Sequence, residues 1–149
     1  MEKYQSILNQ LPYEAPFLFV DEIHELSEEH VIGSYKFKHD EYFYQGHFKN
    51  HPVTPGVILT ECMAQIGLAC LGLFLVSDNE ISADHYPIAL SESNITFLKA
   101  VMPGDTVRVT SEKVYFRFGK LKCKVRMTDA EDELVCHGIL SGMIIPSET

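Results

Sequence analysis

A long apolar run, from Pro55 to Val76, dominates the pattern of hydrophobic and polar positions along the chain. A helix that is apolar on all sides must be buried on all sides, so this run predicts a core helix. Pro52 and Pro55 each fix their own φ and disfavour helical backbone in the residue before them, so the helix cannot begin before about Pro55. The segment in front of it is therefore expected to be a loop.

Shorter stretches alternate between apolar and polar residues, and this period of two predicts strands with one solvated face. The expected strands lie within residues 11–23, at 31–38, within 88–102 and in three runs between 106 and 145. Turns between the last three runs are expected at Phe118-Gly119 and at 130–133. Residues 1–10 are expected to form a short helix, and the polar segment 77–87 a loop.

One core helix and about six antiparallel strands indicate an α+β fold, and 149 residues fit a single domain that covers 1–149. The apolar run is long enough to span a bilayer, but the polar side chains of Glu61 and Gln65 within it argue against a membrane helix. The N-terminal residues 1–10 lack the apolar stretch of a signal peptide. We therefore expect a cytoplasmic protein.

The formal net charge of −9 argues against nucleic-acid binding. The cysteines form no CxxC pair and have no histidine at zinc-finger spacing, so no metal site is expected. Cys62 and Cys70 would lie about 12 Å apart along one helix, which is too far for a disulfide. The cysteines are expected to be reduced core thiols of a cytoplasmic protein.

Candidate chemistry concentrates at the start of the core helix. Glu61 is the anomaly there, because a charged residue is almost never fully buried unless it is paired or functional. Gln65 lies four residues on and shares its helix face, so the two side chains can hold the same water or substrate atom. Gly56, in the first turn, presents a backbone N–H that no intrahelical carbonyl satisfies, at the positive end of the helix dipole. His47 lies in the preceding loop, which can fold back over the helix start.

These parts suit one reaction, the removal of a proton next to a thioester carbonyl while a hydroxyl leaves from the neighbouring carbon. A histidine side chain titrates near neutral pH and is the expected base, and a preorganised backbone N–H polarises the carbonyl. The leaving hydroxyl needs an acid, and an apolar site favours the protonated form of a glutamate. The expected roles are therefore base for His47, carbonyl donor for Gly56 and acid for Glu61.

The motif QGHFxxxPVxPGVxxxExMAQ, from Gln45 to Gln65, resembles the signature of the FabZ-type 3-hydroxyacyl-acyl-carrier-protein dehydratases. These are relatives of the FabA type, which carries Asp at the position of Glu61. The resemblance implies a hotdog fold, in which an antiparallel sheet wraps a long helix. It also implies dehydration of (3R)-hydroxyacyl thioesters to trans-2-enoyl thioesters without a cofactor and, because position 61 is Glu, without strong isomerisation.

The resemblance implies further site contacts and partners. The carbonyl of Val53 is expected to orient His47, and Gln65 to handle the departing water together with Glu61. The family forms dimers whose sites each combine the His of one subunit with the Glu of the other. A homodimer or a higher even oligomer is therefore implied, with a heterodimer as an alternative, and the implied substrate carrier is an acyl carrier protein.

Two other segments resemble the same family. Residues 97–105, ending in Pro-Gly-Asp, match its F-x-[KR]-x-V-x-PGD strand end. Residues 11–21 resemble its LPHRxPFLxVD segment, but Tyr13 and Glu14 replace the His-Arg pair. That pair lies near the dimer and acyl tunnel in the family, so substrate or carrier contacts at this point are in doubt; alternatively, both residues are plain surface positions. The departure leaves specialised polyene or pigment pathways open beside fatty-acid synthesis.

Acyl carrier proteins are acidic, so a basic surface on this acidic chain is a candidate docking site. Four basic residues alternate with apolar ones on one predicted strand and so project from a single face. They are Lys120, Lys122, Lys124 and Arg126. The alternative is an ordinary solvated strand face that discourages edge aggregation, with docking at one of four other lysines. These are Lys36, Lys38, Lys49 and Lys99.

Two other functions stay open at this point. Thioesterases of the hotdog fold also place a carboxylate near a helix start, although they generally lack His47 and its PVxPG turn. A non-catalytic partner subunit of a dehydratase heterodimer or synthase assembly would keep the fold without the reaction. The intact His47 and Glu61 argue against that second alternative.

Overall fold

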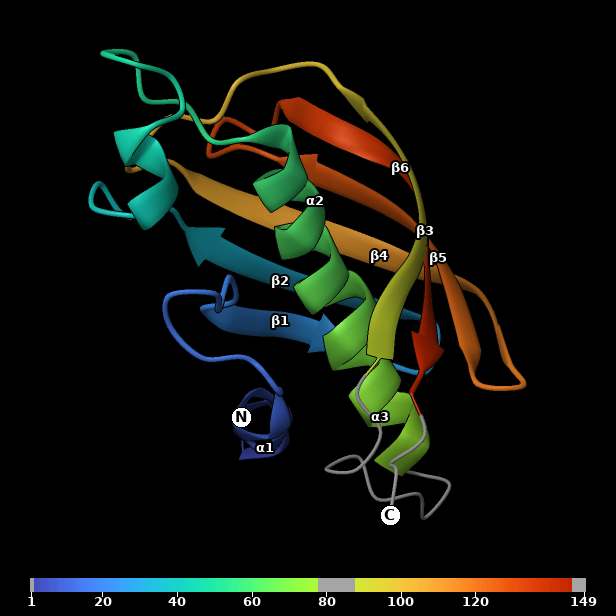
Figure 1. The fold of residues 1–149 in the computed structure, drawn as a ribbon. Helices are drawn as coiled ribbons and strands as arrows, with labels where there is room; N and C mark the ends of the chain where they lie inside the picture. The colour runs from blue at the N-terminus through green and yellow to red at the C-terminus, as the bar shows by residue number, and fades with distance from the viewer. Residues whose placement is uncertain (1, 78–87, 146–149) are drawn as a thin grey trace.

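The computed structural model describes residues 2–77 and 88–145, and Figure 1 shows their arrangement. The elements in chain order are α1 (Glu2–Gln10), β1 (Glu22–Leu26), β2 (His30–Lys36), the 3₁₀ helix η1 (Tyr42–Gln45), α2 (Gly56–Ala64), η2 (Gln65–Cys70), α3 (Leu71–Ser77), β3 (Ile88–Phe97), β4 (Thr106–Arg117), β5 (Lys120–Thr128) and β6 (Leu134–Ile144).

The six strands form one antiparallel sheet in the order β1-β2-β4-β5-β6-β3. The long helix lies across one face of this sheet, and β3 runs beside it at the sheet edge (Figure 1). The predicted α+β hotdog arrangement is confirmed. Because β3 pairs only with β6 within the described chain, its other edge is open along the strand.

The long helix consists of α2, η2 and α3, which follow one another without a break. Over Gly56–Val76 it is long and apolar enough to cross a bilayer by composition, but 78% of its most apolar stretch is buried inside the protein. Its residues join the sheet's inward side chains in one hydrophobic core. As predicted from the apolar run, it is a core helix, and Pro55 precedes its first residue.

The middle of this helix, η2, has π-type geometry and touches the sheet closely at Gly67. A Cβ at Gly67 would come within 3.0 Å of Ser111 on β4. The Gly67 carbonyl accepts hydrogen bonds from the Ser111 hydroxyl at 3.1 Å and from the Cys123 thiol at 3.7 Å. Two side chains of the sheet thus donate hydrogen bonds to this helix carbonyl. Helix segments with π-type geometry occur often beside functional sites.

The remaining predicted elements are also found. The N-terminal helix, the other five strands and both late turns are present close to the expected positions, but the first strand lies later than expected, at Glu22–Leu26, and only its first two residues fall within 11–23. The turn between β4 and β5 has φ of 52° at Phe118 and 76° at Gly119, and Arg117 pairs with Lys120 around it, as in a type I′ hairpin. The expected loop at 77–87 falls outside the described residues except for Ser77, which ends α3.

Candidate active site

His47 lies in the loop between η1 and α2, and hydrogen bonds hold its backbone on both sides. Its N–H donates to the Phe43 carbonyl at 3.2 Å, and its carbonyl accepts from the Val53 N–H at 2.9 Å. The peptide bond between His47 and Phe48 is cis, and the two rings stack at 4.0 Å. The loop therefore closes on itself around the histidine.

The imidazole has a defined orientation. Its Nδ1 lies 2.9 Å from the Val53 carbonyl oxygen. A carbonyl can only accept a hydrogen bond, so Nδ1 carries the hydrogen, and in the neutral ring Nε2 keeps a free lone pair. This is the tautomer that a general base acting through Nε2 requires.

A buried pair of hydroxyl groups ties the ends of this loop together. The phenol of Tyr44, before His47, lies 2.6 Å from the hydroxyl of Thr54, after Val53. Thr54 is fixed in turn by its N–H, which donates to the Val101 carbonyl at 2.9 Å. Burial raises the pKa of Tyr44 to about 12, so the phenol stays protonated.

Gly56 begins α2, with Pro55 as its N-cap. As the first helical residue it has no intrahelical acceptor for its N–H, which points out of the helix start. The ring of Phe97, at the end of β3, lies over its Cα; a Cβ at Gly56 would be 3.1 Å from the ring. At this position only glycine allows the Phe97 ring to lie so close to the helix start, because any side chain would force the ring to shift.

Glu61 lies five residues further along α2 and is held by Gln65 from the same face. The Gln65 amide donates to the Glu61 carboxylate at 3.0 Å and to the Phe17 carbonyl at 3.0 Å, while its own oxygen accepts from the Phe19 N–H at 2.7 Å. Gln65 is fully buried. With both amide N–H groups engaged by the protein, Gln65 positions Glu61 and leaves no donor for a water.

The carboxyl group of Glu61 is partly buried. Burial raises its pKa above the ordinary value, against a smaller opposing effect from the hydrogen bond of Gln65. Glu61 is the only charged residue in the long helix, from Gly56 to Ser77. A raised pKa favours the protonated form, as a general acid near neutral pH requires.

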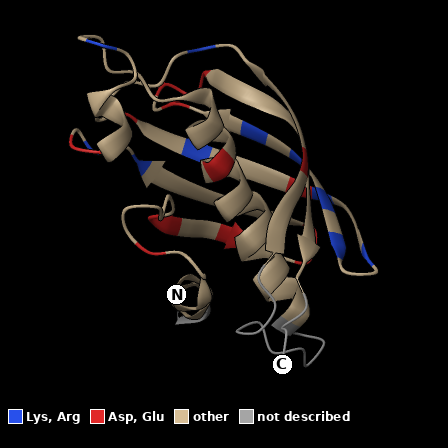
Figure 2. Cartoon of the chain, in the orientation of Figure 1, with Lys and Arg blue, Asp and Glu red and all other residues tan. Residues whose placement is uncertain are grey.

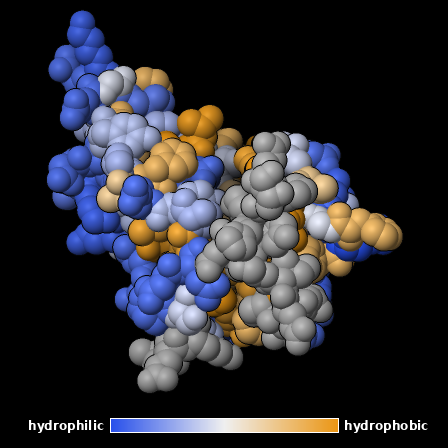
Figure 3. Space-filling model, turned by 60° about the horizontal axis from the view of Figure 1, so that its bottom comes forward, coloured by the Kyte–Doolittle hydropathy of each residue, from blue (hydrophilic) through white to orange (hydrophobic). Residues whose placement is uncertain are grey.

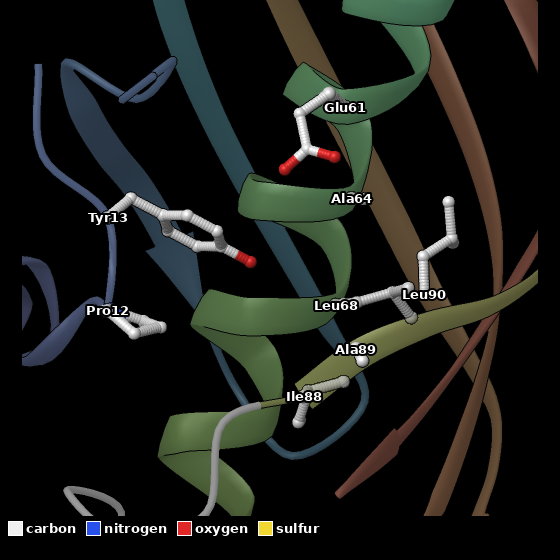
Figure 4. Close-up of a pocket in the computed structure, with 8 residues that line it drawn as sticks. All are labelled: Pro12, Tyr13, Glu61, Ala64, Leu68, Ile88, Ala89 and Leu90. Carbon is white, nitrogen blue, oxygen red and sulfur yellow. The ribbon is translucent and has the colours of Figure 1, made fainter. Parts of the chain in front are cut away.

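A pocket of about 410 Å³ opens beside Glu61 (Figure 4), and we refer to it as the Glu61 pocket. It lies between the N-terminal segment, the long helix and the start of β3. Its lining residues are Pro12, Tyr13, Glu61, Ala64, Leu68, Ile88, Ala89 and Leu90. Apart from Glu61 and the hydroxyl of Tyr13, these side chains are apolar, so the pocket suits an acyl chain.

His47 and Glu61 have different hydrogen-bond partners. Within residues 2–77 and 88–145 no hydrogen bond joins them, and His47 does not line the Glu61 pocket. The helix start and strand β3 meanwhile expose apolar side chains, among them Val57, Leu90 and Phe97. Hydrophobic atoms also reach the surface on the face shown in Figure 3. Of these side chains, Leu90 lines the Glu61 pocket and Phe97 lies over Gly56.

The four basic residues of β5, which we call the basic row, point away from the long helix. Leu121, Cys123, Val125 and Met127, the residues between them, are buried against it. In Figure 2 the blue positions continue along the β4–β5 hairpin. Lys120 is paired with Glu92 at 2.8 Å, whereas Lys124 and Arg126 are exposed. Of the rival lysines, Lys99 is bound to Asp129 and Glu133.

Two features of the site were missed or left open by sequence reasoning. Tyr13 is half-buried and lines the Glu61 pocket, so it is not a plain surface residue, whereas Glu14 is exposed. The spacing of residues along the sequence did not predict the hydrogen bond between Tyr44 and Thr54. The substitution of the family's His-Arg pair was the only sequence signal that pointed to Tyr13.

Comparisons with known proteins agree with this architecture. Residues 11–138 match the model of the FabA-like domain. The FabZ 3-hydroxyacyl-acyl-carrier-protein dehydratase of Clostridium perfringens is 32% identical over 142 residues, which cover 93% of this chain and 95% of the relative.

Two solved structures share the fold at low sequence identity. The dehydratase heterocomplex ApeI:P from Xenorhabdus doucetiae matches with a TM-score of 0.78 and 15% identity, over 93% of this chain and 90% of that chain. A hypothetical thioesterase with coenzyme A from Streptococcus pneumoniae TIGR4 matches with a TM-score of 0.58 and 18% identity, over 86% and 88%. The family match and the FabZ relative show that the chain belongs to the FabA-like family, among the FabZ-type dehydratases.

Proposed function

We propose that the chain dehydrates (3R)-3-hydroxyacyl thioesters carried by an acyl carrier protein to trans-2-enoyl thioesters. The observation that carries this proposal is that the chain supplies both an oriented histidine, His47, and a partly buried acid, Glu61. The Nδ1 of His47 is bound to Val53, and burial raises the pKa of Glu61. The FabZ relative from Clostridium perfringens, which is matched over 95% of its length, is a 3-hydroxyacyl-acyl-carrier-protein dehydratase.

In the proposed reaction, Nε2 of His47 takes a proton from C2 of the acyl chain. The electron pair moves onto the thioester carbonyl oxygen, where the N–H of Gly56 stabilises the developing charge. Glu61 gives its proton to the C3 hydroxyl, the C3–O bond breaks, and water leaves as the C2=C3 double bond forms. Transfer of the proton from His47 back to Glu61 restores the resting state, so no cofactor enters the balance.

We infer a dimer as the catalytic unit, with His47 of one chain facing Glu61 of the partner subunit. Within the described residues, His47 makes no hydrogen bond to Glu61 and is absent from the lining of the Glu61 pocket, which supports this arrangement. The open edge of β3 and the exposed Val57, Leu90 and Phe97 supply a surface for pairing. A heterodimer would use the same surface, and ApeI:P from Xenorhabdus doucetiae is a dehydratase heterocomplex.

Purified wild type, His47→Ala and Glu61→Gln test the reaction. Enoyl-thioester formation from a (3R)-hydroxyacyl carrier protein is followed together with release of free thiol. Enoyl product from wild type, with a loss of about 100-fold or more in both variants, supports the dehydratase. Thiol without enoyl product would assign a thioesterase, and neither product across several acyl chains would favour a partner subunit.

Complementation tests the shared site. Neither His47→Ala nor Glu61→Gln is active alone, but a mixture refolded or co-expressed together contains heterodimers with one intact pair. We expect the mixed sample to recover up to about a quarter of wild-type activity, since half of the dimers are mixed and each carries one intact site. No recovery from mixed dimers of confirmed composition would contradict a site shared between subunits.

We further propose the basic row as the docking surface for the acidic carrier, by charge complementarity. Lys124→Glu with Arg126→Glu should raise KM for the carrier-bound substrate about tenfold, with little change for the same acyl group on pantetheine. If the variant and the wild type have the same KM for each of the two substrates, the carrier docks at another surface. Lys49, two residues from His47 and exposed, would then be the next position to test.

A further inference from the structure

Tyr13 brings a polar group into an otherwise apolar part of the Glu61 pocket. Six of the eight lining residues are apolar; Glu61 and Tyr13 are the exceptions. Glu61 is assigned to the reaction in the proposed function, on which this inference rests. The phenol of Tyr13 has no part in that chemistry, and it stands where the FabZ-type pattern has a histidine.

The geometry of Tyr13 is that of a hydrogen-bond donor facing ligand space. Its ring packs against the hydrophobic core, and Figure 4 shows its hydroxyl pointing toward the helix that carries Glu61 and Leu68. Within the described residues, no hydrogen bond to this hydroxyl is present, in contrast to the buried phenols of Tyr35 and Tyr44. The hydroxyl is therefore open to whatever fills the pocket.

The protonation state of this phenol is settled by its surroundings. Burial first, and then the electrostatic effect of the Glu61 carboxyl group, raise the pKa of Tyr13 to about 12. The group stays neutral near physiological pH, so it retains its proton and can donate a hydrogen bond to an uncharged oxygen.

A wholly aliphatic tail in this pocket would strip water from the Tyr13 hydroxyl and offer nothing in return. A donor left unpaired on binding costs affinity, and sites built around a polar group discriminate against analogues that lack its partner. A tail that carries an oxygen acceptor at the right depth would restore the bond. The expected discrimination between two such tails is about 5- to 100-fold.

We infer that Tyr13 is a specificity-determining residue, which selects acyl chains bearing an oxygen acceptor in the tail over wholly aliphatic chains. The acceptor would be an ether, a hydroxyl or an oxygen on a ring. The acceptor oxygen would lie beyond C3 of the acyl chain. Glu61 acts at C3, and Tyr13 lines the same pocket from a different segment, the N-terminal one, so it would contact the tail rather than C3. The chemical class is thus an oxygenated 3-hydroxyacyl thioester.

Oxygen scanning of the substrate tests this selection. A series of (3R)-3-hydroxyacyl thioesters of equal length is prepared, in which one tail methylene after another is replaced by an ether oxygen. The ratio of kcat/KM for each ether substrate to that for the all-carbon substrate is measured in wild type and in Tyr13→Phe. Tyr115→Phe, a tyrosine stacked with Arg117 on the β4–β5 hairpin, is the matched control.

We expect wild type and Tyr115→Phe to prefer one ether position, and Tyr13→Phe to lose that preference by about tenfold. Because each ratio is taken within one enzyme, partial loss of folded protein cancels. Ratios that do not differ between wild type and Tyr13→Phe at any position would overturn the inference. An equal fall in kcat/KM for every substrate would also overturn it and would assign Tyr13 to assisting Glu61 instead.

A binding measurement separates this inference from the proposed function. Saturated acyl-pantetheines with and without the ether oxygen are titrated into wild type and Tyr13→Phe by calorimetry. The same loss of preference, about tenfold in the ratio of Kd values, is expected without turnover. Absence of turnover would contradict only the proposed dehydratase function. A Kd ratio that is the same in wild type and Tyr13→Phe would contradict only the proposed role of Tyr13 in specificity.

Discussion

The phenolic oxygen of Tyr44 lies 2.6 Å from the hydroxyl oxygen of Thr54, and both side chains are buried. The two residues bracket the loop in which His47 is bound to Val53. Their hydrogen bond therefore fixes the distance between the ends of the loop that orients the proposed base. It connects core packing directly to the position of a reacting group.

Removal of this bond from one side should affect both stability and turnover. In Tyr44→Phe the Thr54 hydroxyl is left buried without a partner, and we expect a loss of about 1–2 kcal/mol in the free energy of unfolding. Tyr44→Phe with Thr54→Val removes both groups and should recover most of that stability while kcat stays low. Urea unfolding and kcat, measured on the same samples, check this; recovery of kcat together with stability would show that the bond does not position His47.

The Glu61→Gln variant should be more stable than wild type near neutral pH. Burial raises the folded-state pKa of Glu61 above its ordinary value of 4.5, so the folded protein binds this proton more tightly than the unfolded chain. Ionisation therefore costs stability progressively as pH rises from about 4.5 through the folded pKa. Melting temperatures should show a gain for Glu61→Gln near pH 7 that shrinks below about pH 4; a gain that is the same at both pH values would refute this cause.

Gly56→Ala should impair catalysis much more than folding. The new Cβ would lie 3.1 Å from Phe97, whose ring is 47% exposed and can move aside, so about 1 kcal/mol or less of stability should be lost. Crowding at the helix start should lower kcat/KM about 100-fold by displacing the thioester carbonyl from the Gly56 N–H. Gly46→Ala is the control, because a Cβ there meets no atom within 4 Å. Equal activity of both variants would exclude the proposed carbonyl site.

Val57→Asp should separate the proposed dimer. Val57 is 78% exposed in the single chain, in the first turn of α2, where a carboxylate is favourable to the helix dipole. The fold of one chain should therefore tolerate the change, whereas burying an unpaired charge in a subunit interface is strongly unfavourable. Light scattering should report a halved mass and assays a loss of activity. Phe118→Asp, at a residue 96% exposed on the β4–β5 turn, should leave the mass unchanged; an intact Val57→Asp dimer would place the interface elsewhere.

Phe118→Asn should stabilise the chain. Phe118 has φ of 52°, a left-handed conformation that costs a bulky residue about 1 kcal/mol and that asparagine adopts more easily. Asn-Gly is also the preferred pair for a type I′ turn. We expect a gain of about 0.5–1 kcal/mol in the free energy of unfolding, measured by urea denaturation. A loss of stability would mean that the exposed ring makes a contact that outweighs the strain.

Much of the fold followed from local patterns in the sequence. The apolar run from Pro55 onward had to be a buried helix, and alternation of apolar and polar residues located the strands between 88 and 145. Pro52 and Pro55 restricted the backbone so strongly that the helix start was predictable to within a residue. These patterns depend only on residues that are neighbours along the chain, so they can be interpreted without knowing how the chain packs.

The composition of the candidate site also came from sequence, since His47, Gly56 and Glu61 fall within one short motif. The surroundings of these residues could not be predicted from the sequence. Gln65 binds Phe17 and Phe19, more than forty residues away, and Tyr13 enters the pocket beside Glu61 from the N-terminal segment. Contacts of this kind depend on how the segment before β1 packs against the long helix.

The sequence by itself determined the helix, the strands, the order of the reactive groups and their chemical types. Only the tertiary structure decided that Gln65 is engaged by two backbone groups and by Glu61, that Tyr44 and Thr54 close the His47 loop, and that Tyr13 faces the Glu61 pocket. The reason is physical: periodicity and backbone restriction act between neighbours, whereas hydrogen-bond partners and pocket walls are set by packing between segments far apart in the chain.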